Sequence, residues 1–120
     1  MGNPLCHVVL HANGASEAKK FYGEILDWSF DDMQTLVGPY TMIGVGDGDG
    51  VGGGIMANPA AGTPSHWLAY IQVEDVAAAV KKAAALGGQI LQEKTDLPSG
   101  AFAVMADPTG AAVSLFQGAS

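Results

Sequence analysis

Leu5–Trp28 reads LCHVVLHANGASEAKKFYGEILDW, and this stretch decides the fold class. Its first six residues form an apolar run with the length of a strand. An Asn-Gly pair ends the run, and Ser16 is the predicted N-cap of a helix over about Glu17–Asp27. Apolar side chains recur there every three or four residues, which is the pattern of an amphipathic helix. The stretch therefore predicts a strand followed by a helix that packs on it.

The same order of elements occurs twice in the chain. Three strand-like pieces follow the first helix: Trp28–Met33, Thr35–Val45 (divided by Gly38-Pro39) and Gly52–Met56. The second half begins again with an apolar strand, then a helix over Val76–Leu86 that Asp75 caps and Gly87-Gly88 ends. The predicted strands of this half are Trp67–Val73, Gln89–Gln92, Ala101–Ala106 and Ala112–Phe116, with a turn at Asp107–Gly110 before the last.

This repeat predicts an α+β fold of two tandem β-α-β-β-β modules. We expect a single domain over residues 1–120, with module one at about 4–57, a joint at about 58–65 and module two at about 66–118. The Gly46–Gly50 stretch is predicted to be a turn-rich loop rather than a calcium site, because it lacks the further oxygen ligands of such a site.

The charge of the chain restricts its partners. Five lysines face twelve carboxylates, the net charge is −7, and there is no arginine. Nucleic acid and anionic membranes are therefore not expected as partners, and a neutral, aromatic or cationic small molecule is favoured over an anionic one. The first residues lack the features of an export signal, and the single cysteine, Cys6, suits the cytoplasm.

Three motifs resemble the vicinal-oxygen-chelate proteins, the superfamily of glyoxalases, bleomycin-resistance proteins and extradiol dioxygenases. They are Phe21–Trp28 after the first strand, Val73–Val76 leading to Gly87-Gly88, and Phe102–Gly110 continuing through Ser114-Leu115-Phe116. They occur in the family's order and cover nearly the whole chain. The resemblance implies paired modules whose curved sheet surrounds a cavity, and it implies a homodimer.

The resemblance also implies where metal ligands would stand in metal-dependent members. His7 occupies the first of these positions, but Leu68 and Ser114 occupy two others, and Gly53–Met56 offers no acid. One imidazole cannot hold a divalent ion tightly, because such sites need about three or four N, O or S donors. No cofactor is therefore expected. A rebuilt metal site that joins His7 with His11 or His66 is the alternative that the sequence leaves open.

Side chains alternate between the two faces of a strand, which predicts the lining of the cavity. Trp67, Ala69, Ile71 and Val73 are expected to face the second helix. Met105 either lines the cavity or, as is more common for methionine, belongs to the core. The predicted ligand-binding residues are His7, Val9, Tyr40, Met42, His66, Leu68, Tyr70, Gln72, Phe102, Ser114 and Phe116.

Three functions follow as hypotheses. The first is a metal-free, glyoxalase/bleomycin-resistance-like protein that binds a small molecule. The second is a lyase, isomerase or dioxygenase-type enzyme with a non-standard metal site, and the third is a non-catalytic interaction protein with a vestigial cavity. No Ser-His-Asp or Cys-His pairing can be placed, so the catalytic residues are not identified, and general-base work by His7 or Tyr70 is left open.

Overall fold

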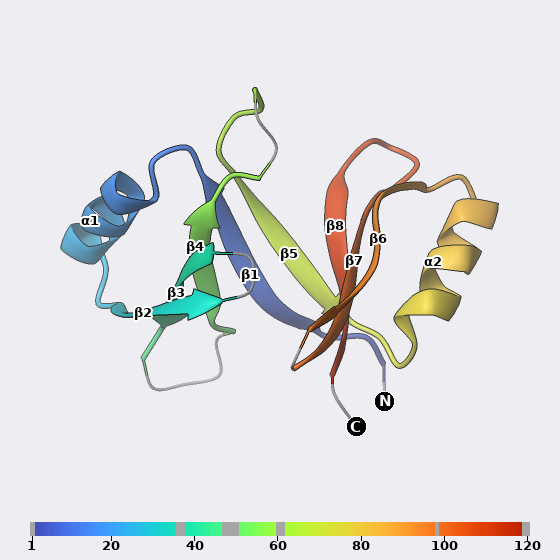
Figure 1. Ribbon diagram of the computed structural model, residues 1–120, viewed down its shortest axis with the longest axis horizontal. Coiled ribbons are helices and arrows are strands. Elements are labelled where there is room, and N and C mark those ends of the chain that lie inside the picture. The colour runs from blue at the N-terminus through green and yellow to red at the C-terminus, as the bar shows by residue number, and fades with distance from the viewer. Residues whose placement is uncertain (1, 36–37, 47–50, 60–61, 98, 119–120) are drawn as a thin grey trace. The chain divides into compact units, whose positions relative to one another are not determined.

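The computed structural model describes residues 2–35, 38–46, 51–59, 62–97 and 99–118 (Figure 1). Its contacts group the chain into two compact units. The first unit comprises residues 7–68, and the second comprises residues 1–6 together with 69–120. Two strands, β1 and β5, contribute residues to both units.

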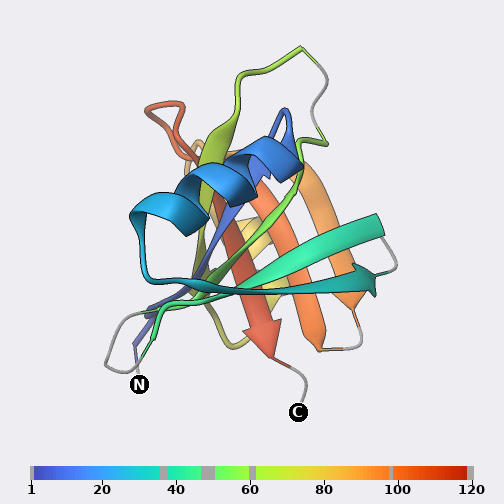
Figure 2. The same ribbon diagram turned by 90° about the vertical axis from the view of Figure 1, so that its left-hand side faces the viewer.

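The first unit holds one helix and a mixed sheet. Its elements are β1 (Leu5–Ala12), α1 (Ala15–Ile25), β2 (Ser29–Thr35), β3 (Gly38–Gly44) and β4 (Gly53–Ala57). The strand order is β2-β3-β4-β1, with β1 parallel to β4 and the other neighbours antiparallel. Figure 2 shows α1 lying across these strands.

The second unit repeats this plan. Its elements are β5 (His66–Gln72), α2 (Val76–Ala85), β6 (Gln89–Leu97), β7 (Gly100–Ala106) and β8 (Ala112–Gly118). The order is β6-β7-β8-β5, again with one parallel pair, β5 with β8. The predicted α+β fold of two β-α-β-β-β modules is confirmed. Neither helix, of 11 and 10 residues, is long enough to cross a bilayer, and the described residues contain no other helix.

The core of the first unit lies between α1 and its sheet. Leu10, Ala12, Ile43 and Ile55 are buried there and pack against side chains of α1 that include Tyr22. Leu10 and Ala12 are alternate residues of β1, so the strand directs them to the same face. His7, Val9 and His11 consequently lie on the opposite face, which α1 does not cover.

The start of α1 differs from the prediction. The helix begins at Ala15, its N-cap residue is Gly14 with φ of 117°, and no side chain caps it. Ser16 therefore lies inside the first turn. A left-handed residue is needed where the chain turns from β1 into the helix, and glycine adopts that conformation without steric cost.

Trp67 packs in the first unit, so its predicted contact with the second helix is wrong. Its ring meets Tyr22 edge-on at 5.7 Å between centroids and Trp28 at 6.5 Å, while Tyr22 and Trp28 stack at 5.7 Å. The reason is that β5 passes from one unit to the other, and its first three residues belong to the unit of α1.

The core of the second unit lies under α2. Val76, Val80, Ala103 and Leu115 form it, and Ile71 and Val73 pack against it as predicted. Met105 also belongs to this core rather than to a cavity wall, because it follows Ala103 by two residues and therefore shares its face. The first residues of the chain are held along β5, where the Gln72 N–H donates to the Pro4 carbonyl at 2.9 Å.

The ends of α2 and the last turn follow the sequence signals. Asp75 is the N-cap of α2, and Gly87 after the helix has φ of 99°. The Asp107 carboxylate accepts from the Thr109 and Ala111 N–H groups, which fixes the predicted turn. Residues 47–50 of the predicted Gly-Asp loop lie outside the described residues.

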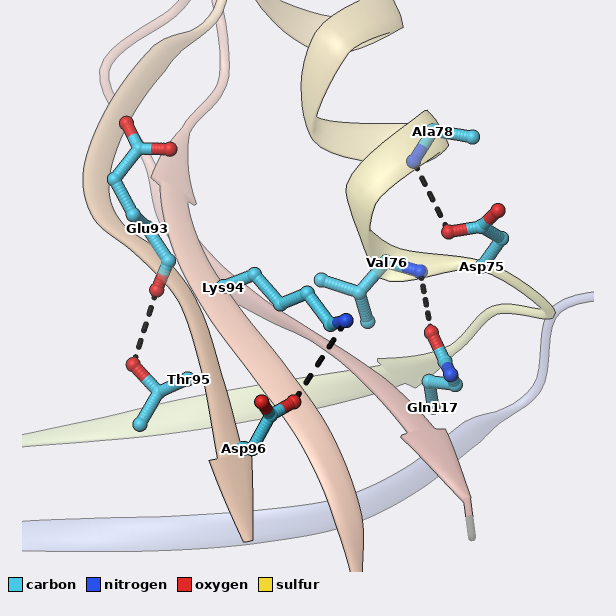
Figure 3. Close-up of polar contacts among 8 residues, drawn as sticks. All are labelled: Asp75, Val76, Ala78, Glu93, Lys94, Thr95, Asp96 and Gln117. Atoms are coloured by element: carbon cyan, nitrogen blue, oxygen red, sulfur yellow. Dashed lines mark hydrogen bonds and ion pairs between the residues drawn. The ribbon is translucent and has the colours of Figure 1, made fainter. Parts of the chain in front are cut away.

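Two side chains satisfy the free N–H groups at the start of α2 (Figure 3). The Ala78 N–H donates to Asp75 Oδ1 at 3.2 Å, and the Val76 N–H donates to Gln117 Oε1 at 2.8 Å. We expect Asp75→Ala to lower the free energy of unfolding by about 1 kcal/mol, because one helix N–H loses its partner. Urea denaturation measures the change.

The matched control is Asp96→Ala in β6. Its carboxylate is 85% exposed and lies 3.7 Å from the Lys94 ammonium, a surface pair of little value. We expect a change of less than about 0.5 kcal/mol for this variant. Equal losses in the two variants would show that Asp75 does not act as a cap.

Candidate functional site

A histidine and a tyrosine meet on the helix-free face of the first unit. His7 Nε2 lies 3.0 Å from the Tyr40 hydroxyl, so β1 and β3 are linked by a side-chain hydrogen bond across β4. Burial lowers the pKa of His7 below its usual value of 6.5. The imidazole is therefore neutral near pH 7, and it can exchange hydrogen bonds rather than supply a positive charge.

Gly54 makes this contact possible. It is buried in β4 between Val9 of β1 and Met42 of β3, its register partners. The Tyr40 ring lies so close over Gly54 that a Cβ added there would collide with the ring and its hydroxyl. A glycine is thus required by the close approach of an aromatic ring, a role that the sequence did not reveal, although the Gly52-Gly53-Gly54 run was its signal.

The other two histidines meet further along β1. His11 Nδ1 lies 3.2 Å from His66 Nε2, and the two rings are 4.9 Å apart at an interplanar angle of 78°. His66 Nδ1 lies 3.0 Å from the Pro64 carbonyl oxygen. Burial, followed by the charge of His66, lowers the pKa of His11. His11 and His66 therefore converge, while the partner of His7 is a tyrosine.

The second unit has its own polar and aromatic group on the face away from α2. Tyr70 and Ser114 are register partners on β5 and β8, and their side chains are hydrogen-bonded. The fully buried Ser114 hydroxyl also lies 3.0 Å from the Ala103 carbonyl, to which it donates. The Tyr70 ring is 6.5 Å from that of Phe102, and burial raises the pKa of the Tyr70 phenol.

The remaining predicted site residues fall on the same faces. Phe116 is the register partner of Phe102, which places both rings on the side of Ser114. Val9 and Leu68 are 2% exposed, whereas Met42 and Gln72 are exposed. Within each unit the buried side chains of this set lie beneath the half-buried rings, and the rings and the exposed side chains are accessible to a ligand.

Comparison with known proteins identifies the family. Residues 7–116 match the family model described as a glyoxalase-like domain. The chain belongs to this family. It is therefore a member of the vicinal-oxygen-chelate superfamily that the three sequence motifs resemble.

Curated relatives support this membership. The proteins named "Putative glyoxylase CFP32" of Mycobacterium bovis and Mycobacterium tuberculosis are each 39% identical over 102 residues, which is 83% of this chain. That match spans 38% of the length of each relative.

Solved structures share the fold. The hypothetical protein BH1468 from Bacillus halodurans matches with a TM-score of 0.73 at 13% identity, over 100% of this chain and 97% of that chain. Methylmalonyl-CoA epimerase from Mycobacterium tuberculosis matches with a TM-score of 0.71 at 14% identity, over 97% of this chain and 88% of that chain.

The glyoxalase-like domain does not offer the donors of a metal-dependent relative. No three His, Cys, Asp or Glu side chains among the described residues are grouped so that they could hold an ion. Leu68 and Ser114 stand at two of the positions where the resemblance places ligands, and the Ser114 hydroxyl is already bonded to the Ala103 carbonyl. The side chains present do not fit the family's metal.

Neither a thiol nor an activated hydroxyl is available as a nucleophile at these groups. The Cys6 thiol donates to the Tyr70 carbonyl at 3.6 Å, and burial raises the pKa of Cys6, which keeps it protonated. The Ser114 hydroxyl contacts a carbonyl and a phenol rather than a base. These groups offer hydrogen bonding and apolar contact, and the neutral His7 imidazole can also exchange a proton.

A double-mutant cycle tests the contact between Gly54 and Tyr40. We expect Gly54→Ala to lower the free energy of unfolding by about 1–3 kcal/mol, because the new methyl group overpacks the site under the ring. The same substitution in a Tyr40→Ala background should lose less than half of that, because the ring is gone. Urea denaturation of the four proteins measures both values.

Gly118→Ala is the matched control, since nothing lies within 4 Å of the added Cβ. A change of less than about 0.5 kcal/mol is expected there. If Gly54→Ala costs the same with and without the Tyr40 ring, glycine is required at position 54 for another reason.

The lowered pKa values of His7 and His11 predict how stability depends on pH. At pH values between the pKa of these two histidines in the folded chain and about 6.5, the unfolded chain binds more protons than the folded chain. The contribution of the two neutral histidines to the free energy of unfolding is therefore complete above about pH 6.5. It is lost as the pH falls through their pKa values in the folded chain.

We expect the urea midpoint to fall between pH 7.5 and pH 5.5, and to fall less in a His7→Gln/His11→Gln variant. Asp32 and Asp107 do not interfere, because their carboxyl pKa values are lowered and titrate well below this range. A wild-type protein that is equally stable at both pH values would contradict the prediction.

Proposed function

We propose that this glyoxalase-like domain binds a small neutral, aromatic or cationic molecule and does so without the metal ion of its metal-dependent relatives. The observation that supports the proposal is that apolar and hydrogen-bonded side chains stand where the resemblance places metal donors. His7 is bonded to Tyr40, and Leu68 and Ser114 take the place of ligands. Apolar surface with a few fixed polar groups is the usual composition of a small-molecule site.

In the first unit the proposed contact group is His7 with Tyr40. The hydrogen bond to His7 fixes the Tyr40 ring over Gly54, beside the apolar side chains of Val9 and Met42. A ligand placed there meets an aromatic face and two polar atoms whose positions are set before it arrives. Such preorganisation lowers the entropic cost of binding.

In the second unit the proposed contact group is Tyr70 with Phe102 and Phe116. The Tyr70 phenol is hydrogen-bonded to Ser114, and the Phe102 ring lies beside the Tyr70 ring. Aromatic rings at such distances contribute apolar area and attract the face or edge of another ring or a cation. Gln72 is exposed on the same strand face and offers an amide to the ligand.

The charge of the chain favours a neutral, aromatic or cationic ligand over an anionic one. There is no arginine to clamp a carboxylate or a phosphate, and twelve carboxylates face five lysines. A polyanionic molecule is therefore disfavoured. This separates the proposed ligand from the coenzyme A ester named for the methylmalonyl-CoA epimerase of similar fold.

The proposal extends to assembly and location. We propose a homodimer, as many single-chain relatives of this length form, and size-exclusion chromatography with light scattering measures it. We also propose a reducing compartment such as the cytoplasm, since the one cysteine, Cys6, has no partner for an internal disulfide.

A thermal-shift screen tests the binding function. The probes are aromatic amines, neutral aromatic compounds and bleomycin, with methylmalonyl-CoA as the anionic comparison. A ligand present at 100 times its dissociation constant adds about 2.7 kcal/mol of stability, which raises the melting temperature by several degrees. We expect such a shift with at least one aromatic or cationic probe and none with methylmalonyl-CoA.

Variants in the two units then locate the site. Tyr40→Phe removes the hydroxyl bonded to His7, and Phe102→Leu removes the ring beside Tyr70. The variant that weakens the binding of the probe identifies the unit that holds it. Met105→Leu, in the core under α2, is the control that should leave it unchanged. Elemental analysis of untagged protein completes the test: a stoichiometric divalent ion that is lost on His7→Gln would favour the metal-dependent enzyme instead. No shift with any probe would favour the interaction protein.

A further inference from the structure

The His11–His66 pair is not used by the proposed function. His11 is 8% exposed at the far end of β1 from His7, and four residues along a strand correspond to about 13 Å. His66 begins β5, and both histidines lie in the first unit. Their contact is therefore a separate cluster of nitrogen donors.

The spacing of the two nitrogens suits a shared metal ion. His11 Nδ1 and His66 Nε2 are 3.2 Å apart. Two imidazole nitrogens that each bind one ion at about 2.0–2.1 Å with an angle near the tetrahedral value are separated by about 3.3 Å. The separation of the two nitrogens is thus already close to that of two imidazoles sharing one ion, and a turn of the rings would aim both lone pairs at it.

The surroundings of His66 orient it as a metal ligand. A carbonyl oxygen only accepts hydrogen bonds, so the contact at 3.0 Å requires that His66 Nδ1 carries the proton and donates it to the Pro64 carbonyl. The lone pair of His66 is then on Nε2 and points at His11. Ligating histidines usually donate their second N–H to such an acceptor, which fixes the ring.

His11 can bind an ion through Nδ1 and still keep one ring proton, on Nε2. Without an ion, His11 Nδ1 donates to His66 Nε2, because that nitrogen can only accept. His11 Nε2 has no hydrogen-bond partner among the described residues, and no buried side-chain nitrogen or oxygen there lacks one, so Nε2 retains contact with solvent. When an ion binds Nδ1, the proton moves to Nε2 through solvent, and the ring stays neutral.

Met56 adds a third donor of a different kind. It is the register partner of His11 in the parallel pair of β1 and β4, so the two side chains lie next to each other on the helix-free face. Met56 is half-buried. A thioether is a soft ligand, and two imidazoles with a thioether favour copper(I) over zinc or magnesium.

We propose that His11, His66 and Met56 form a copper(I) site in the first unit that does not use His7. Met56 is also the register partner of Tyr40, so the site borders the proposed ligand group of that unit. Two neutral imidazoles and a thioether bind the ion without a charged ligand, and no electron is transferred when copper(I) itself is supplied. The net charge of −7 favours a cation at this surface.

Competition with the chromophoric copper(I) chelator bicinchoninate tests the proposal. The experiment uses untagged protein under anaerobic, reducing conditions in a Cys6→Ser background, because the one thiol would otherwise compete for copper. We expect one copper(I) per chain. His11→Gln and His66→Gln should each lower the affinity at least about tenfold, as lost ligands do, and Met56→Leu should lower it several-fold.

Two matched controls accompany these variants. His7→Gln removes the remaining histidine and Met105→Leu removes a thioether in the core of the second unit. Both should retain wild-type copper affinity. Binding that survives in the His11→Gln/His66→Gln variant overturns the site, and unchanged affinity in Met56→Leu overturns the thioether ligand.

Nuclear magnetic resonance of the wild-type chain keeps the proposal testable if a variant does not fold. Copper(I) is diamagnetic, so its binding is followed directly on the ring nitrogens and the methionine methyl groups. We expect shifts of His11, His66 and the Met56 methyl, with His7 and Met105 unchanged. Shifts of His7 instead would place the ion elsewhere and overturn the proposal.

Discussion

Alternation of side chains along β1 is the constraint on which the core and the candidate site of the first unit both depend. Leu10 and Ala12 lie under α1, so His7, Val9 and His11 must lie on the other face. A shift of one residue would bury two imidazoles under a helix and expose the apolar core. The burial of Leu10 therefore also holds His7 within reach of Tyr40 and His11 within reach of His66.

The second unit applies the same constraint with different chemistry. Its strands direct Ile71, Ala103 and Leu115 to α2, which leaves Tyr70 and Ser114 on the other face. The buried Ser114 hydroxyl is satisfied by a phenol and a carbonyl, so a serine at a position where relatives hold a ligand is structurally stable. The two units share one architecture, while the side chains on their helix-free faces differ.

Neutrality is common to the polar groups of these faces. Burial lowers the pKa of His7 and His11 and raises that of Tyr70, so each group favours its uncharged form near pH 7. Together with the absence of arginine, this leaves side chains that offer hydrogen bonds, aromatic contact and lone pairs but no positive charge. Both the small-molecule proposal and the copper(I) proposal draw on that property, and on β1 they use different residues, His7 and His11.

The sequence by itself determined the two-module repeat, the cap at Asp75 and the faces of β1 and β8, because these follow from periodicity and from contacts between residues close in the chain; the family followed from three motifs in order. It misplaced the N-cap of α1 at Ser16 and assigned Trp67 to the wrong helix, since a glycine conformation and the course of β5 are not encoded in local patterns. Only the tertiary structure decided that Tyr40 covers Gly54, that His7 pairs with Tyr40 and that His11 pairs with His66. The partners of His7 and His11 lie 33 and 55 residues away in the chain. Their contacts depend on strand register and on the path of the chain between strands, which periodicity does not specify.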